Sequence, residues 1–177
     1  VVVSGFRGNI SAVEQALSLP RFQTYLAARH GVYEDAMDLY EWNAKISNAL
    51  FFPMHVCEVA IRNAVSEAIG KVHGPNWPYS RAFQQTLPDL RGPTFNPRNE
   101  LKKIATKHPG APGKVIADLK FIFWETMFTQ RFCTQIWHKS IHNVLPYASA
   151  NIPAATPVML VSHVHTRLGK IRGIRNR

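Results

Sequence analysis

The residues best suited to chemistry lie at the end of the sequence, where two arginines flank an asparagine in Arg175–Arg177. A guanidinium presents a planar fork of donors that matches phosphate oxygens, and it stays charged at any physiological pH. A second Arg-Asn pair, Arg62 and Asn63, follows Glu58 by four residues. That spacing places a carboxylate and a guanidinium side by side on a helix. The C-terminal arginines can therefore bind phosphate, while Glu58 and Arg62 are placed to pair with each other.

Two helical segments must position these residues. In each of them the apolar residues fall on one face at 100° per residue. The faces comprise Met54, Ile61, Val65, Ala68, Ile69 and Val72 in the first segment, and Leu160, Val161, Val164, Leu168 and Ile171 in the last. Arg175 projects within about 40° of the centre of the second stripe. An arginine on that side must be paired or must line a cleft, so we expect it near Glu58 or a backbone carbonyl. A snorkelling or salt-bridged arginine with a purely structural role explains the same geometry.

The remaining elements also follow from helix signals. Residues 11–14 form a capping box, and Pro20 suits the first turn of the next helix. A long helix is predicted over 33–72, with a kink or break at Pro53. Residues 74–96 are predicted to form a turn followed by a long surface connection. Helices are then expected from Asn96-Pro97 to about residue 107, over 114–128 and 129–144, and from Thr156-Pro157 to the end, with a loop over 146–155. The sequence predicts an all-α bundle.

Composition sets the broad class. The 177 residues are 46% hydrophobic and 11% aromatic, enough for a folded core and too many for a disordered chain. No apolar run approaches the roughly 18–20 residues of a membrane-spanning helix, so we expect no membrane association. Cys57 and Cys133 are too few for a disulfide framework or a cysteine-rich zinc site, and we expect both to be small buried apolar residues in a cytoplasmic protein.

Charge is distributed unevenly along the chain. The net charge is +10; residues 1–70 hold five cations and seven anions, and residues 71–125 hold nine and four. Residues 126–177 hold seven cations and no carboxylate. This asymmetry favours an anionic partner, most simply nucleic acid, although a solvated basic surface gives the same composition.

Other combinations of residues are weaker candidates. Arg131 and His138 stand seven positions apart, but Phe132 follows the arginine where a polar residue would be expected. The pairs His163/His165 and His138/His142 lack a third metal ligand at helical spacing, so no metal site is predicted. The aromatic residues Phe121, Phe123, Trp124, Phe128, Phe132 and Trp137 are predicted to belong to the core rather than to a base-stacking surface. Walker, dinucleotide and serine-elbow motifs are absent, and no cofactor is predicted.

A series of short motifs resembles the Abi-like (abortive infection) proteins of the HEPN superfamily. In chain order they are Leu39–Asn43, Glu58–Ala64, Gly74–Trp77, Phe123-Trp124 with Trp137, and Ile174–Arg177. The resemblance implies a HEPN-like helical bundle over residues 33–177, with residues 1–32 as an N-terminal helical extension. HEPN ribonucleases carry an arginine, usually a polar neighbour and, four to six residues after the arginine, a histidine. In the Abi-like branch this motif typically reads Arg-Asn-Arg, two residues, then His.

Carried onto this sequence, the resemblance makes Arg175 and Asn176 catalytic and Arg177 the second basic residue. Arg167, Lys170 and Arg172 would extend RNA binding, and Glu58, Arg62 and Asn63 would support the site. It further implies a homodimer with a composite cleft, metal-independent cleavage of RNA in phage defence or toxin action, and an antitoxin protein as a candidate partner.

The sequence departs from the family pattern at one point. It stops at Arg177, so the motif's histidine is missing, and we expect this chain to be inactive as given. It also begins at Val1 rather than Met, and we expect its N-terminus to be cut. A non-catalytic helical module that binds nucleic acid or protein is the alternative function.

Overall fold

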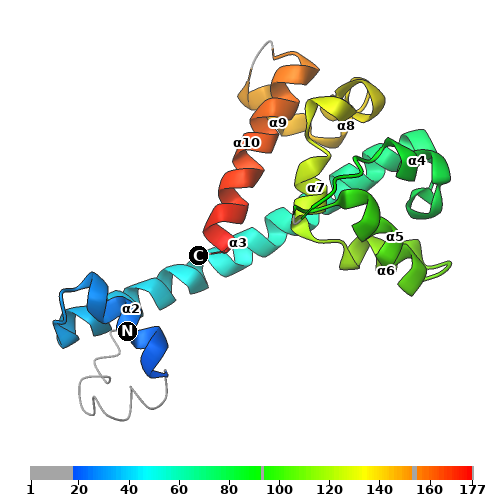
Figure 1. Cartoon of the computed structure of the whole chain (residues 1–177). Helices are drawn as coiled ribbons and strands as arrows, with labels where there is room; N and C mark the ends of the chain where they lie inside the picture. The colour runs from blue at the N-terminus through cyan, green and yellow to red at the C-terminus, as the bar shows by residue number, and fades with distance from the viewer. Residues whose placement is uncertain (1–17, 93, 153–154, 177) are drawn as a thin grey trace. The chain divides into compact units, whose positions relative to one another are not determined.

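The computed structural model describes residues 18–92, 94–152 and 155–176, and within them all regular structure is helical (Figure 1). This confirms the all-α prediction. The α-helices are α2 (Leu19–Ala28), α3 (Tyr33–His73), α4 (Arg81–Thr86), α5 (Pro97–Lys107), α6 (Pro112–Asp118), α7 (Phe121–Thr126), α8 (Ile141–Val144), α9 (Pro146–Asn151) and α10 (Pro157–Arg175). The other helical elements of the described residues are two short 3₁₀ helices, η1 (Trp77–Tyr79) and η2 (Gln130–Phe132), and a π-helical turn, η3 (Cys133–Trp137).

The chain divides into two compact units, residues 1–53 and 54–177. In the first unit, the Phe22 side chain is 1% exposed and its ring lies 5.0 Å from that of Tyr33, which joins α2 to the start of α3. The Asn43 amide donates a hydrogen bond to the Tyr25 hydroxyl at 2.8 Å. The unit boundary lies at Pro53, whereas the resemblance begins the HEPN-like domain at residue 33; that domain boundary stays a prediction.

Helix α3 is continuous from Tyr33 to His73, so a break at Pro53 is wrong, and the kink predicted as its alternative stays a prediction. A proline removes one backbone donor from the helix, but the turns on either side can keep their own hydrogen bonds, so the helix need not end there. The Pro20 prediction is confirmed, because this residue lies in the first turn of α2. The capping box predicted over 11–14 lies outside the described residues.

The second unit is built around one apolar core. Helix α3 contributes Ile61, Val65, Ala68 and Ile69, all buried as predicted, while Val72, at the C-terminal end of the same face, is 52% exposed. The six aromatic residues predicted for the core are also all buried. Trp77 joins the core to α3, because its indole nitrogen donates to the Ser66 hydroxyl at 3.1 Å.

Residues 80–92 and 94–96 are more structured than the predicted surface connection. Ser80 caps α4 by accepting a hydrogen bond from the Phe83 backbone, and both Phe83 and Leu87 are fully buried. The Arg98 guanidinium fastens the segment to α5 by donating to the carbonyls of Leu87 and Gln85, at 2.6 and 3.0 Å. A small apolar cluster and one arginine therefore order a stretch whose composition is typical of a loop. The predicted cap by Asn96 is confirmed, because its side chain accepts from Asn99.

The two helices predicted over 114–144 are wrong in extent. The chain forms α6, α7, η2, η3 and α8 instead, with extended backbone at Leu119 and Lys120. The loop predicted over 146–155 also contains the short helix α9. The breaks follow from the burial of aromatic side chains. Phe121, Phe123 and Trp124 are all buried in the core. Neighbouring residues of a straight helix point in directions 100° apart, so one long helix could not direct all of these side chains into the same core.

Candidate phosphate-binding site

Helix α10 carries the predicted arginines, and its position follows from its sequence. Thr156 caps the helix by accepting a hydrogen bond from the Met159 backbone, as predicted, and Pro157 occupies the first turn. The apolar stripe is confirmed: Leu160, Val161 and Leu168 are at most 2% exposed. This face packs against α7, η2 and η3. The C-terminal end of α10 then lies beside α3 (Figure 1).

The structure brings Arg175 to the predicted partner. Its Nη1 lies 3.1 Å from Oε2 of Glu58, which confirms the expectation that this arginine lies against the helix bearing Glu58 and Arg62. The other carboxylate oxygen of Glu58 lies 3.3 Å from Nη2 of Arg62, the predicted pair one helical turn apart. One carboxylate therefore bridges two guanidinium groups from opposite ends of the sequence of this unit.

This Glu58–Arg62–Arg175 cluster keeps a surplus of positive charge. Two cations share one anion, and the Arg175 side chain is 49% exposed, so solvent or a ligand reaches it. Arg62 is 20% exposed, and within the described residues its Nε has no hydrogen-bond partner. An arginine fork offers five donors, and here a single acceptor uses one of them. The cluster is thus equipped to bind an anion such as a phosphate.

Most of the other predicted site residues are accessible to a ligand. Asn63, Asn176, Arg167 and Lys170 are exposed, so each is open to a ligand. Arg177 lies outside the described residues.

Arg172 has a role that the sequence did not reveal. Its Nε lies 2.6 Å and its Nη2 3.3 Å from the two carboxylate oxygens of Glu125, a bidentate pair. Glu125 is buried at 7% exposure on α7, and its hydrogen bond, followed by its charge, raises the pKa of Arg172 above the usual value. Arg172 therefore fixes α10 to α7, and its role in RNA binding stays a prediction. The signal that was missed is a lone carboxylate inside the aromatic segment 121–128.

Neighbouring nucleophiles and histidines add little chemistry. Cys57 is half-buried, less than predicted, while Cys133 is buried as expected. Burial, with the adjacent charge of Glu58, raises the pKa of the Cys57 thiol and keeps it protonated. His55 is exposed and precedes Glu58 by three residues, which places it on a neighbouring position of the same helix. Sequence reasoning overlooked His55, because only its position beside Glu58 sets it apart from the other histidines.

The alternative pairs do not form a site. Arg131 donates from Nε to the Thr86 carbonyl at 2.8 Å, which explains its position structurally. His165 Nδ1 lies 3.3 Å from the Glu125 carbonyl, and His163 is exposed. Across the described residues, no group of three or more histidine, cysteine or carboxylate side chains is arranged to hold a metal ion.

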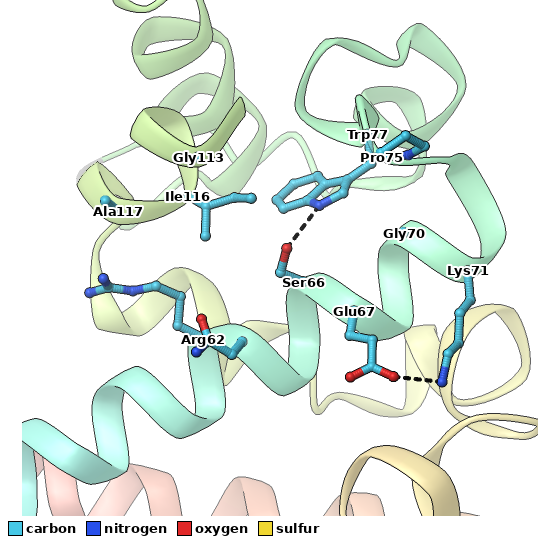
Figure 2. Close-up of a pocket in the computed structure, with 11 residues that line it drawn as sticks. Arg62, Ser66, Glu67, Gly70, Lys71, Pro75, Trp77, Gly113, Ile116 and Ala117 are labelled. Atoms are coloured by element: carbon cyan, nitrogen blue, oxygen red, sulfur yellow. Dashed lines mark hydrogen bonds and ion pairs between the residues drawn. The ribbon is translucent and has the colours of Figure 1, made fainter. Parts of the chain in front are cut away.

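A groove adjoins the cluster along α3. It has a volume of about 710 Å³ and lies between α3, the turn that follows it, and α6. Arg62 belongs to both the cluster and the groove, whose α3 side continues through Asn63 and Ser66 to Lys71. Figure 2 shows α6 opposite α3, with the indole of Trp77 hydrogen-bonded to Ser66 between them.

Comparisons with protein-family models, curated proteins and solved structures give no match for this chain. The resemblance to the Abi-like proteins, and with it the HEPN assignment, therefore stays a prediction. In the described part of the chain, none of the helices has the length and apolar character needed to cross a bilayer.

Proposed function

We propose that this chain binds single-stranded RNA at the Glu58–Arg62–Arg175 cluster and is the body of a metal-independent, RNA-cleaving effector of HEPN type. The observation that supports the proposal is the 3.1 Å ion pair between Arg175 and Glu58. It joins the C-terminal Arg-Asn pair to the Arg-Asn pair of α3, and these are the residues to which the resemblance assigns function. The surplus charge of the cluster suits a phosphate diester.

The proposed chemistry assigns each residue a role. The RNA 2′-hydroxyl gives its proton to a general base and its oxygen attacks the adjacent phosphorus; the P–O5′ bond then breaks, which leaves a 2′,3′-cyclic phosphate and a 5′-oxygen that takes up a proton. Arg175 stabilises the negative charge that develops on the phosphorane. Asn176 supports that contact, and the exposed Arg167 and Lys170 bind flanking phosphates. Proton transfer needs a group that titrates near neutral pH, which the resemblance supplies as a histidine after the Arg-Asn-Arg motif.

The same resemblance supplies the biological setting of the proposal. It implies a homodimer whose two motifs form one cleft, acting in the bacterial cytoplasm in phage defence or as a toxin with an antitoxin protein.

A non-catalytic RNA-binding module is the second candidate. It is favoured by the position of the α10 histidines, since His165 precedes Arg175 by ten residues, or about 15 Å of helix. A binder of this kind would use the cations without turnover.

Binding and cleavage assays separate these functions. We expect the 177-residue chain to bind a mixed-sequence single-stranded RNA weakly in EDTA, with affinity that falls steeply as salt rises, and to leave the RNA intact. Arg175→Ala should weaken binding only several-fold, because one phosphate contact among several is lost. In a version that continues to a histidine at the motif's spacing, the same substitution should abolish cleavage.

Three results would overturn the proposal or its assignment of roles. Absence of salt-dependent RNA binding would remove the proposed function. A requirement of the longer version for a divalent metal would contradict the metal-independent chemistry. Cleavage by the 177-residue chain would show that proton transfer uses a residue already present, and His55→Ala would then identify or exclude the histidine beside Glu58.

A further inference from the structure

The groove between α3 and α6 has the dimensions of a small-molecule site. Its volume of about 710 Å³ lies within the range of roughly 300–1,000 Å³ typical of ligand pockets. From Arg62 to Lys71 its α3 side extends about 14 Å at 1.5 Å per residue. No side chain fills it at Gly113 on α6, where an added Cβ would meet nothing within 4 Å among the described residues.

The polar groups of the groove are concentrated on α3, and three of them keep donors or acceptors to offer. Asn63 is exposed and its amide has no hydrogen-bond partner among the described residues, so it has both donors and an acceptor to offer. Ser66 accepts from Trp77 and keeps its own hydroxyl hydrogen for another acceptor. Arg62 holds one hydrogen bond to Glu58 and has further donors.

The opposite side of the groove is apolar. Ile116 and Ala117 of α6, with Pro75 beyond the end of α3, provide hydrocarbon surface without charge (Figure 2). A flat, weakly polar ring packs well against such a surface, while its edge reaches amide and hydroxyl groups on the other side. This division of polar and apolar walls matches one nucleotide unit, with a charged phosphate, a polar sugar and a planar base.

Electrostatics give the bound unit a direction. At the far end of the groove Lys71 is paired with Glu67 at 2.7 Å, so that end is neutral overall. At the near end Arg62 belongs to the cluster with surplus positive charge. A phosphate is therefore attracted to the Arg62 end, next to Arg175, which leaves the end at Lys71 for a neutral base.

We propose that the groove between α3 and α6 binds one nucleotide of the RNA strand, with its phosphate at Arg62 and its base between Asn63, Ser66 and the apolar surface of α6. This inference rests on the proposed function and adds a specificity subsite to it. A free nucleoside monophosphate shares the required chemistry and therefore serves as the probe.

The test titrates adenosine 5′-monophosphate, inorganic phosphate and single-stranded RNA into the 177-residue chain by calorimetry. The occluding variant is Gly113→Leu, whose side chain enters the groove from the second position of α6. Its matched control is Ala82→Leu, exposed at the second position of α4 and outside the groove. We expect Gly113→Leu to weaken the nucleotide and RNA affinities by about tenfold or more, and the control to leave both unchanged.

A second variant keeps the test independent of the fold of α6. Asn63→Asp is isosteric and exposed, and it should weaken nucleotide binding several-fold by adding a negative charge beside the phosphate. Equal affinity for inorganic phosphate and the nucleotide would overturn the base subsite and leave a simple anion site. Tighter binding of a glutamate-rich peptide than of the nucleotide would overturn the nucleotide assignment in favour of a protein ligand.

The outcomes distinguish this inference from the proposed function. If RNA binding depends on Arg175 but neither Gly113→Leu nor Asn63→Asp alters nucleotide or RNA affinity, the groove is not a subsite and the proposed function stands. If the nucleotide binds in a Gly113-dependent manner while RNA does not bind, the groove is a nucleotide site and the proposed function fails. If neither ligand binds the wild-type chain, both are wrong.

Discussion

Glu125 is the residue that fixes where α10 ends. Its buried carboxylate holds Arg172 by two contacts, three residues before Arg175, and its backbone carbonyl lies 3.3 Å from His165 Nδ1. The position of Arg175 beside Glu58 therefore depends on the carboxylate of Glu125, which is not part of the Glu58–Arg62–Arg175 cluster.

Glu125→Gln should destabilise the fold by about 1–3 kcal/mol, because the substitution leaves the charge of Arg172 without its carboxylate in a partly buried place. Urea unfolding measures this loss. Glu67→Gln is the matched control: it breaks the exposed pair with Lys71, at 56% and 47% exposure, and should change stability by less than about 0.5 kcal/mol. Equal losses in the two variants would show that Glu125 makes no special contribution.

The position of a residue could be predicted from sequence where the spacing within its own helix determines the direction of its side chain. Arg175 was expected near Glu58 because helical angles determine which side of α10 it occupies. Glu125 was missed because its partner lies 47 residues away, and no local spacing reports such a pair. The groove was missed for the same reason, since α6 and α3 meet only in the folded chain.

At the scale of elements, capped helices were the predictable ones. Asn96-Pro97 and Thr156-Pro157 start α5 and α10 as expected, because a capping side chain satisfies donors of its own first turn. The division of residues 112–144 into short helices was not predictable. The extended backbone at Leu119 and Lys120 carries no glycine or proline signal and reflects the burial of the aromatic residues that follow.

Pro53→Ala should stabilise α3, because alanine restores a backbone donor in an exposed position inside a continuous helix. The gain should approach the roughly 3 kcal/mol by which proline disfavours a helix interior. Circular dichroism and thermal unfolding measure helix content and stability together. Pro20→Ala is the control, since a proline in a first turn replaces a donor that has no partner, and stability there should barely change. A loss of stability in Pro53→Ala would argue against the continuous helix.

At the scale of the whole molecule, stability should fall as the solution becomes mildly acidic. The ring of His73 lies 5.2 Å from that of Phe83. Burial there lowers the pKa of His73 below its ordinary value of 6.5. The unfolded chain then binds this proton at a higher pH than the folded one, so stability is complete above 6.5 and is lost as pH falls toward the folded pKa.

Unfolding free energies between about pH 7.5 and pH 5 test this linkage. Hydrogen bonds to Asp89 and Asp118 lower the pKa of each carboxyl below its ordinary 3.8, so both stay ionised across that range and do not contribute. His73→Gln should be less stable at neutral pH but should lose less stability on acidification. An identical loss in the two proteins would mean that another group titrates.

The shared carboxylate of Glu58 makes the two arginines antagonists in anion binding. A phosphate that takes Arg62 frees Glu58 to neutralise Arg175 more fully, which lowers the affinity of Arg175 for a second phosphate. By thermodynamic reciprocity, a phosphate on Arg175 weakens binding at Arg62 by the same factor. If the proposed function holds, two neighbouring phosphates of one strand would therefore bind this cluster with negative coupling, each weakening the other's contact.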